Sequence, residues 1–387
     1  MCAATLRRTF TNRELTPAAW ASERSPADYY ITNPAIQRYD EGWVMAYKVV
    51  TAHYHAERFA ICRLDENLDI VPGTVVPLSD TIPNITPQVG DPRLLVFGGQ
   101  LWVLYCHFRL PSLLYLAPLD ADTLAATGPG RPLLLDDRQW QEKNWMLFAH
   151  EGELWAVYTI APHVILHLDL RAPDVIRCRR AYMTTWDVSS YARRFGALRG
   201  GTSPVRVGDA YYAFFHSVYF VNRFHATFAP AWHALRARLG RPEHWQGPQQ
   251  TDGDVRSLQP TTGWIYAPRA LPWRLDSMLR RYERRFARRH YVAGCYGFRA
   301  EPPFAPFCLS AEPVLWPEHE PAPQRQPRLS PLNEQVVFPA GAAFLPNGRW
   351  LVSLGIHDER CVLQELACSV STSATTSAPA NTSKRSS

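Results

Sequence analysis

The chain has 387 residues, of which 46% are hydrophobic and 20% charged, so it has enough apolar material for a core and is not a disordered protein. Its formal net charge of +6 is concentrated in one stretch, with thirteen Arg against five acidic residues between Arg223 and Arg289, and the remainder gives no reason to predict a nucleic-acid partner. No run of about 18 apolar residues occurs, so no transmembrane segment is predicted.

The eight cysteines give no sign of a metal site. Their spacing includes no CxxC pair and no His-paired cluster of the kind that binds zinc, so neither a metal nor an organic cofactor is predicted. The N-terminus also lacks the apolar core of a signal peptide. A reduced protein in the cytoplasm is therefore the predicted location.

Residues 1–25 are predicted to form an N-terminal extension, and a repeat follows them. In each copy a turn with Gly or Asp precedes an aromatic residue and a short alternating run, and the five aromatic residues are Trp43, Trp102, Trp155, Tyr211 and Trp350. The first four lie 59, 53 and 56 residues apart. This period, combined with hairpin turns and strands of period two, is typical of the blades of a β-propeller.

Each copy also has an apolar strand before it and usually an outer strand after it, as in residues 33–36 and 59–65 around the first copy. Two independent domains would not produce one continuous repeat. The predicted fold class is therefore all-β, a single five-bladed β-propeller over residues 26–368.

Tyr211 and Trp350 lie 139 positions apart, which is too far for one blade, and about 220–290 are predicted to be a helical basic insertion. Within it, residues 273–289 place apolar side chains on one helix face and Arg on the other. Two interpretations stay open: a helix packed on the propeller rim with a solvated basic face, or a contact for phosphate groups, a partner or an anionic membrane surface. Residues 369–387 are rich in Ser, Thr and Ala and are predicted to be a disordered tail.

Polar residues stand at the ends of the predicted inner strands. Because the inner strands of a propeller converge on one axis, such residues can share a cavity although they are far apart in the sequence. The groups at these positions are Asn33; Asp91 with Arg93; Lys143 with Asn144; Arg206 with His216; and His357 with Asp358.

Several short motifs accompany these residues in a fixed order: Asn33-Pro34, Gly90-Asp91-Pro92-Arg93, Lys143-Asn144, Pro204-Val205-Arg206 with His216, Val336-Val337-Phe338-Pro339, and Gly355-Ile356-His357-Asp358. In this order and spacing, from about Asn33 to Glu365, the chain resembles the β-mannoside phosphorylases and hydrolases among the five-bladed propeller glycosidases. Each motif alone is short, and the blade-by-blade arrangement carries the resemblance.

The resemblance implies a role for each matching residue. Asp91 takes the position of the general acid, while Asn33 and Asp358 match residues that hold sugar hydroxyls. Arg206 and His216 match residues that cradle phosphate. The remaining substrate-binding positions of the motifs are Lys48, Arg93, Lys143 and Asn144.

The chemistry fits this set. Glycosidic bond hydrolysis usually needs two carboxylates, whereas phosphorolysis needs one acid and a cationic cradle, because phosphate arrives already anionic. Inorganic phosphate would then be a co-substrate, and an oligosaccharide or sugar phosphate the ligand. A pKa raised by burial would keep Asp91 protonated for donation.

Three departures from the family pattern bear on this reading. Gly90 replaces the usual Glu before the Asp-Pro-Arg motif, and Lys48 replaces the Arg of a Tyr-Arg pair. Tyr158-Thr159-Ile160 stands where phosphorylases have a phosphate-binding Arg. The loss of that Arg weakens the case for phosphate.

The predicted function is therefore a carbohydrate-active enzyme that cleaves or transfers a glycosyl unit, a β-mannosyl unit by resemblance, through phosphorolysis or hydrolysis with one Asp as general acid. Two alternatives stay open. One is a glycosyltransferase on the same scaffold that uses a nucleotide sugar or sugar phosphate as donor. The other is a glycan-binding propeller without catalysis, which would keep the aromatic residues and not require Asp91.

Overall fold

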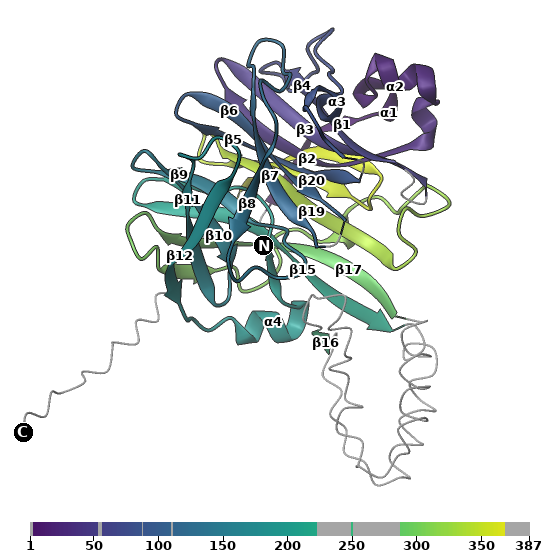
Figure 1. Ribbon diagram of the computed structural model, residues 1–387. Helices are drawn as coiled ribbons and strands as arrows, with labels where there is room; N and C mark the ends of the chain where they lie inside the picture. The colour runs from purple at the N-terminus through teal and green to yellow at the C-terminus, as the bar shows by residue number, and fades with distance from the viewer. Residues whose placement is uncertain are drawn as a thin grey trace, which may run out of the picture.

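The computed structural model describes residues 3–52, 56–86, 88–109, 111–222, 249–250 and 287–367. Across these residues the chain is mostly β, with several sheets and a few short helices (Figure 1). The strands are β1 (Ala3–Phe10), β2 (Tyr29–Tyr39), β3 (Gly42–Thr51), β4 (Glu57–Leu64), β5 (Val89–Phe97), β6 (Gln100–His107), β7 (Leu113–Leu119), β8 (Arg131–Leu135), β9 (Met146–His150), β10 (Glu153–Thr159), β11 (His163–Asp169), β12 (Ile176–Thr184), β13 (Leu198–Gly200), β14 (Val205–Val207), β15 (Ala210–Asn222), β16 (Gln249–Gln250), β17 (Ala287–Arg299), β18 (Pro306–Leu309), β19 (Asn333–Phe344), β20 (Trp350–Ile356) and β21 (Arg360–Ala367).

The helices are short and lie at the edges of the strands. The α-helices are α1 (Asn12–Leu15), α2 (Ala18–Glu23), α3 (Leu78–Thr81) and α4 (Ser189–Phe195), and Pro26–Asp28 and Pro317–His319 form single 3₁₀ turns. In Figure 1, α1 and α2 lie together beside the first strands, and α4 lies near β16 at the opposite end of the molecule.

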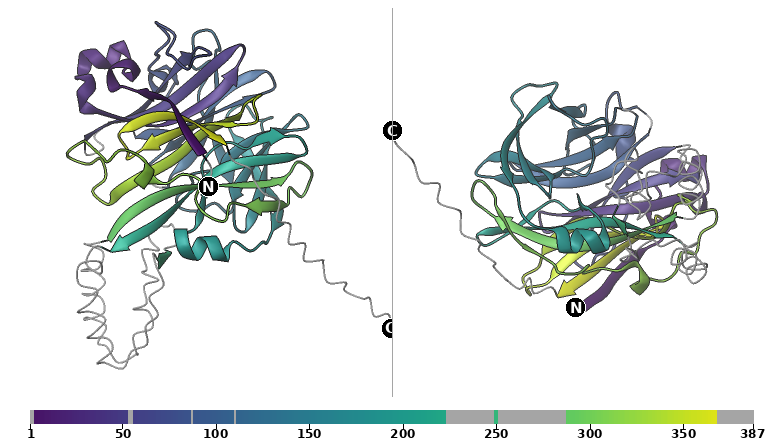
Figure 2. Two further views of the ribbon diagram at one scale, coloured as in Figure 1. Left: turned by 180° about the vertical axis from the view of Figure 1, so that it is seen from behind. Right: turned by 90° about the horizontal axis from the view of Figure 1, so that it is seen from below.

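Antiparallel strands follow one another in consecutive groups: β2–β4, β5–β7, β9–β12, β13–β18 and β19–β21. Neighbouring groups lie side by side through their early strands, with β2 beside β5, β5 beside β9 and β14 beside β19. The order closes on itself because β19 lies beside β2, so the last group, in yellow, meets the first, in purple (Figures 1 and 2).

Hydrogen bonds between groups join the strands into three sheets. The parallel pair β8–β12 links the second and third groups into an eight-stranded sheet, and the parallel pair β17–β19 links the last two groups. The first group, β2–β4, forms a three-stranded sheet by itself.

The aromatic residues that mark the sequence repeat all lie at or near the start of a long strand. Trp43, Trp102, Trp155, Tyr211 and Trp350 lie at or near the starts of β3, β6, β10, β15 and β20. The turns before these strands contain residues with positive φ, including Asp40, Gly152, Gly208 and Gly348. Positive φ is what a tight hairpin turn requires, so the repeat in the sequence corresponds to a repeat of hairpins.

The N-terminal residues, which were predicted to form an extension before residue 26, pair with a strand of the last group. β1 pairs antiparallel with β21, from Ala3 opposite Ala367 to Phe10 opposite Cys361. Arg7 and Glu365 form an ion pair across these two strands. The first strand of the chain thus completes the last group, because β21 would otherwise present an unpaired edge.

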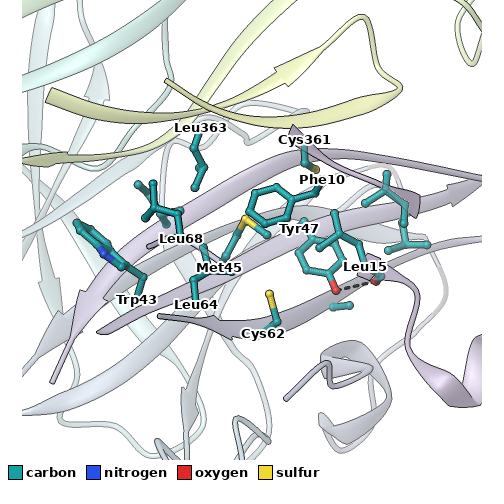
Figure 3. Packing of buried hydrophobic residues seen from close by; sticks show 14 of the residues in the cluster. Phe10, Leu15, Trp43, Met45, Tyr47, Cys62, Leu64, Leu68, Cys361 and Leu363 are labelled. Atoms are coloured by element: carbon teal, nitrogen blue, oxygen red, sulfur yellow. Dashed lines mark hydrogen bonds between the residues drawn. The ribbon is translucent and has the colours of Figure 1, made fainter. Parts of the chain in front are cut away.

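A core cluster joins this closing strand to the first group. Phe10 and Leu363 contribute to it from β1 and β21, and Met45 and Tyr47 contribute from β3 (Figure 3). The hydroxyl of fully buried Tyr47 donates a hydrogen bond of 2.7 Å to the backbone oxygen of Leu15 in α1. The helices before residue 26 are therefore fixed to the body of the protein.

The predicted insertion interrupts a long strand pair. β15 and β17 stay in register from Ala210 opposite Arg299 to Asn222 opposite Ala287. The predicted helix over 273–289 and the predicted tail over 369–387 lie almost entirely outside the described residues. The six cysteines of the described part are all free and buried, which agrees with the absence of paired spacing in the sequence.

Candidate active site

Asp91 and Asn33 meet where two inner strands are irregular. The pairing of β5 with β6 shifts register between Gly90 and Arg93, and that of β2 with β3 shifts between Thr32 and Ala35. Both Asn33 and Asp91 have positive φ, at 53° and 52°. A bulge re-aims a side chain out of the regular alternation, and here the Asn33 amide donates a hydrogen bond of 2.9 Å to Asp91 Oδ1.

Lys48 supplies a positive charge to the same carboxylate. Its Nζ lies 3.8 Å from Asp91 Oδ1 and 3.1 Å from Glu57 Oε1, and it stands 4.4 Å from the centre of the Phe108 ring. Lys48 is 8% exposed, so these ion pairs are little screened by solvent. The lysine that replaces the family's Arg thus still faces the proposed acid.

Gly90 makes room for this lysine. A β-carbon at residue 90 would lie 3.0 Å from Lys48 Cε and 3.2 Å from Phe108 Cε2. Any side chain there would press on the Lys48 stem. The two departures from the family motif, Gly90 and Lys48, are therefore sterically coupled.

The charge state of Asp91 differs from the expectation of a raised pKa. Burial raises the pKa of Asp91, but the positive charges of Lys48 and Arg93, with the Asn33 hydrogen bond, outweigh it and bring the pKa below its ordinary value. The expectation that burial raises the pKa of Asp91 and keeps it protonated is thus wrong. Asp91 is a carboxylate at neutral pH.

Arg93 acts on Asp91 through its charge. Its Nε donates a hydrogen bond of 2.8 Å to the Gly201 backbone oxygen, and its guanidinium lies over the Phe338 ring at 5.2 Å. Burial lowers the pKa of Arg93 to about 10, so it remains a cation at neutral pH. With 5% exposure, this residue holds neighbouring strands together beneath the site.

Lys143 and Asn144 line a cavity of about 380 Å³ together with Arg199. Burial lowers the pKa of Lys143, the charge of Arg199 lowers it further, and the negative charge of Asp91 raises it. Lys143 thus belongs to this cavity and also interacts with the charge of Asp91. Asn144 has φ 62°, so it shares the unusual backbone of Asn33 and Asp91.

Arg206 does not reach this site. It is exposed on β14, and its Nε donates a hydrogen bond of 3.2 Å to the Gly208 oxygen. It lines a different cavity of about 560 Å³, together with residues from the far ends of β2 and β19 such as Arg38 and Phe344. The structure therefore does not bring Arg206 together with the other predicted site residues.

Arg199, which the sequence analysis missed, takes the place expected for Arg206. It lies on β13 directly opposite His216 on β15, and it lines the same cavity as Lys143. The sequence does contain a signal for Arg199, because it is followed by two glycines, Gly200 and Gly201, which allow close packing. A β-carbon on Gly200 would lie only 1.9 Å from the Asn144 oxygen.

His216 lies beneath the cavity as a neutral ring. It is 2% exposed, and its ring centre lies 4.6 Å from that of Phe338 and 6.0 Å from that of Tyr291. Burial lowers the pKa of His216 well below its ordinary value, and the charges of Arg199 and Arg93 lower it further. A buried neutral imidazole can donate or accept one hydrogen bond, but it adds no positive charge to an anion site.

Asp358 is a second carboxylate, and its pKa is shifted in the opposite direction to that of Asp91. It stands in the turn after β20 with φ 59°, and Asn333 Nδ2 donates a hydrogen bond of 2.8 Å to its Oδ2. Burial raises its pKa, the Asn333 hydrogen bond and the Lys48 charge oppose this, and the negative charge of Asp91 raises it further. The charges of Lys48 and Asp91 thus both act on the Asp358 carboxyl.

No group of three or more His, Cys, Asp or Glu residues in the described ranges has a geometry that could hold a metal ion. No helix among these residues is long and apolar enough to cross a membrane.

No protein-family model matches the chain, and no curated protein matches it either. Solved structures do match its fold. A protein provisionally assigned as a glycoside hydrolase from Parabacteroides distasonis has TM-score 0.52 at 12% identity, covering 88% of each chain. A glycosyl hydrolase from Bacteroides ovatus has TM-score 0.51 at 12% identity, covering 87% of this chain and 84% of its own.

A third structure is described by its family, the mannoside phosphorylases of GH130, which contains glycoside hydrolases that target β-1,2 mannosidic linkages in Candida mannan. Its TM-score is 0.52 at 11% identity, and the match covers 87% of this chain and 84% of the other. The chain therefore shares the fold of these three solved structures.

Proposed function

We propose that this protein is a carbohydrate-active enzyme that transfers or cleaves a β-mannosyl unit, with Asp91 as general acid and an anionic phosphate group bound beside it. Its consecutive strand groups would be the five blades of a β-propeller. The observation that carries the proposal is the Asp91 carboxylate, bonded to the Asn33 amide and flanked by Lys48. Lys143, whose charge acts on Asp91, lines a cavity together with Arg199.

The excess of positive charge favours phosphate as the second reactant. Lys48, Lys143 and Arg199 act electrostatically on Asp91 or on each other, and Arg289 adds to the charge near Lys143. A hydrolase that activates water needs a second carboxylate as base, and the nearby candidate, Asp358, has a raised pKa. Cations that hold an anionic nucleophile need no such base.

In the proposed reaction a phosphate oxygen attacks the anomeric carbon of the mannosyl unit. The glycosidic carbon–oxygen bond breaks, and the leaving oxygen takes its proton from Asp91. Asp91 is ionised in the unliganded site. Because a bound phosphate would neutralise the cations that lower the pKa of Asp91, that pKa would rise on binding, and proton uptake would accompany phosphate binding.

The test is synthesis from α-mannosyl phosphate and simple mannoside acceptors, followed as released phosphate and as new oligosaccharide. We expect Asp91→Asn to lower kcat by about 10² to 10⁴, the usual contribution of a general acid. Asp122→Asn, in an exposed turn, is the matched control and should keep wild-type activity. Equal turnover by wild type and Asp91→Asn would rule out the role of Asp91.

A glycosyltransferase with a nucleotide-sugar donor is the second candidate. The observation in its favour is the number of cations, because Lys143, Arg199 and Arg289 suit a diphosphate as well as a single phosphate. A thermal-shift screen against GDP-mannose, UDP-sugars and phosphate separates the two functions. Stabilisation by a nucleotide sugar and not by phosphate would favour the transferase.

A further inference from the structure

Glu57 is a buried carboxylate that lies outside the sequence motifs. It belongs to β4 and is 8% exposed. It stands opposite Val50 on β3, two positions from Lys48, so Glu57 and Lys48 are diagonal neighbours on one face of the sheet. A buried carboxylate costs free energy unless a partner compensates its charge. Lys48 is such a partner, because its Nζ lies 3.1 Å from Glu57 Oε1.

The Lys48 ammonium lies between two carboxylates. Its Nζ is 3.1 Å from Glu57 Oε1 and 3.8 Å from Asp91 Oδ1, so it lies closer to Glu57. The Lys48 stem is confined, because a β-carbon on Gly90 would lie 3.0 Å from its Cε and the centre of the Phe108 ring lies 4.4 Å from its Nζ. On a confined stem, the nearer carboxylate determines the position of the ammonium.

The position of this ammonium matters for the proposed acid. A lysine that donated a hydrogen bond to Asp91 would hold it as an anion, because such a bond favours the ionised form of a carboxyl group. Burial raises the pKa of Asp91 and the Lys48 charge lowers it, but the separation of 3.8 Å is longer than a hydrogen bond. Asp91 can therefore take up a proton without first breaking a direct bond to Lys48.

We propose that Glu57 is a positioning residue, which draws the Lys48 ammonium away from Asp91 and so keeps the acid free to take up its proton. This inference rests on the proposed function of Asp91. Other ionisable groups interact with Asp91 from further elements: Arg93 on β5, Cys106 on β6, Lys143 before β9 and Asp358 after β20. Burial raises the pKa of Cys106 to about 12, so its thiol is neutral. A substitution at Glu57 leaves all of these groups in place.

Crystal structures of wild type and Glu57→Gln test the position of Lys48 directly. The amide keeps the size of the side chain and removes its charge, so Lys48 Nζ should move from 3.8 Å to within about 3.2 Å of an Asp91 carboxylate oxygen. Glu57→Asp keeps the charge on a shorter side chain and should show a smaller movement in the same direction. An unchanged position of Lys48 in Glu57→Gln would overturn the inference.

The pH profile of kcat tests the consequence for the reaction. Activity is followed as mannosyl phosphate formed from β-mannobiose and inorganic phosphate at saturating concentrations, the direction in which Asp91 donates its proton. With Lys48 closer, the pKa of Asp91 should fall, so the alkaline limb should move to lower pH. We expect the kcat of Glu57→Gln to be about threefold to tenfold below wild type on that limb and within about twofold at the acidic plateau. Glu57→Asp should lie between the two.

Glu365→Gln is the matched control, because Glu365 on β21 is also a buried carboxylate, 4% exposed, and its Oε1 lies 2.9 Å from Arg349 Nε. This change should lower the melting temperature without moving the limb. An unmoved limb in Glu57→Gln, with turnover by wild type and its loss in Asp91→Asn, would overturn the inference and leave the proposed function standing. Absence of turnover in wild type would instead overturn the proposed function, and the role of Glu57 with it.

Discussion

The Asp91 carboxylate is held as an anion by the same cations that would bind an anionic substrate. Lys48 lies 3.8 Å from it, and the charges of Arg93 and Lys143 also lower its pKa. Occupation of the site by phosphate would offset these charges. The acid would then acquire its proton only when its reaction partner is present, which protects the site from unproductive proton transfer.

Gly90→Ala tests this arrangement at a single residue. The added methyl group would press on Lys48 and move its ammonium away from Asp91, so the pKa of Asp91 should rise. If Asp91 must be protonated to act, the alkaline limb of the pH profile of kcat/KM should move to higher pH. Gly128→Ala, where the nearest atom to a β-carbon is 4.0 Å away, is the control.

The same substitution should change stability with a defined sign. The folded-state pKa of Asp91 is below its ordinary value, so its ion pairs stabilise the protein above the unfolded pKa and are lost as pH falls through the folded one. Gly90→Ala should therefore lower the free energy of unfolding at neutral pH by more than it does in acid. Equal destabilisation at both pH values in denaturant titrations would contradict the link to Lys48.

At the scale of elements, β1 closes the last strand group and buries an aromatic anchor. Phe10 is 4% exposed in the cluster that joins β1 and β21 to the first group. We expect Phe10→Ala to lower the free energy of unfolding by about 3–5 kcal/mol, the usual cost of such a core truncation. Urea denaturation measures this loss.

Leu6→Ala on the same strand is the control for that experiment. Leu6 is 60% exposed, so its truncation should cost less than about 0.5 kcal/mol. If both substitutions have equally small effects, β1 is not an integral part of the fold. A large effect of Phe10→Ala alone would show that the N-terminal strand closes the structure.

The positions of strands were predictable from the sequence, and the positions of charges along them only in part. Trp43 and Trp102 marked hairpins correctly because turn chemistry and alternation are local signals. The meeting of Asn33 with Asp91 followed from equivalent places in successive repeats. Inferences about hairpins and about equivalent positions require only the period of the sequence repeat.

Arg199 and Arg206 show where this reasoning ends. They lie seven residues apart, a distance of up to roughly 23 Å in extended chain, so they belong to opposite ends of one inner segment. A short sequence motif identifies the strand segment that contains both residues, but it does not show which end of that segment faces the site. The lowered pKa of Asp91 was likewise hidden, because it depends on Lys48 from another strand pair.

At the scale of the whole molecule, the strand pair β15–β17 carries the insertion without a break in register. Asn222 and Ala287 are paired neighbours at its end. A two-residue Asn-Gly turn in place of residues 223–286 can therefore close the hairpin. This change also removes the short strand β16.

We expect this shortened protein to fold with a melting temperature close to that of the full chain and to bind mannose with unchanged affinity. The reason is that Asn33, Lys48 and Asp91 lie on β2, β3 and β5, outside this hairpin. Differential scanning calorimetry and titration with mannose measure both properties. Loss of mannose binding in a folded shortened protein would instead assign the insertion to the site.

The left-handed backbone at Asn33, Asp91, Asn144 and Asp358 has a consequence for any mutational scan of this protein. Asn, Asp and Gly adopt that conformation at little cost in free energy, whereas β-branched and bulky residues are strained in it. Loss of function after substitution at these four positions will therefore reflect both the backbone conformation and the chemistry of the side chain. Scans for new substrate preference are better directed at Lys143 and Arg199, whose backbone is not left-handed.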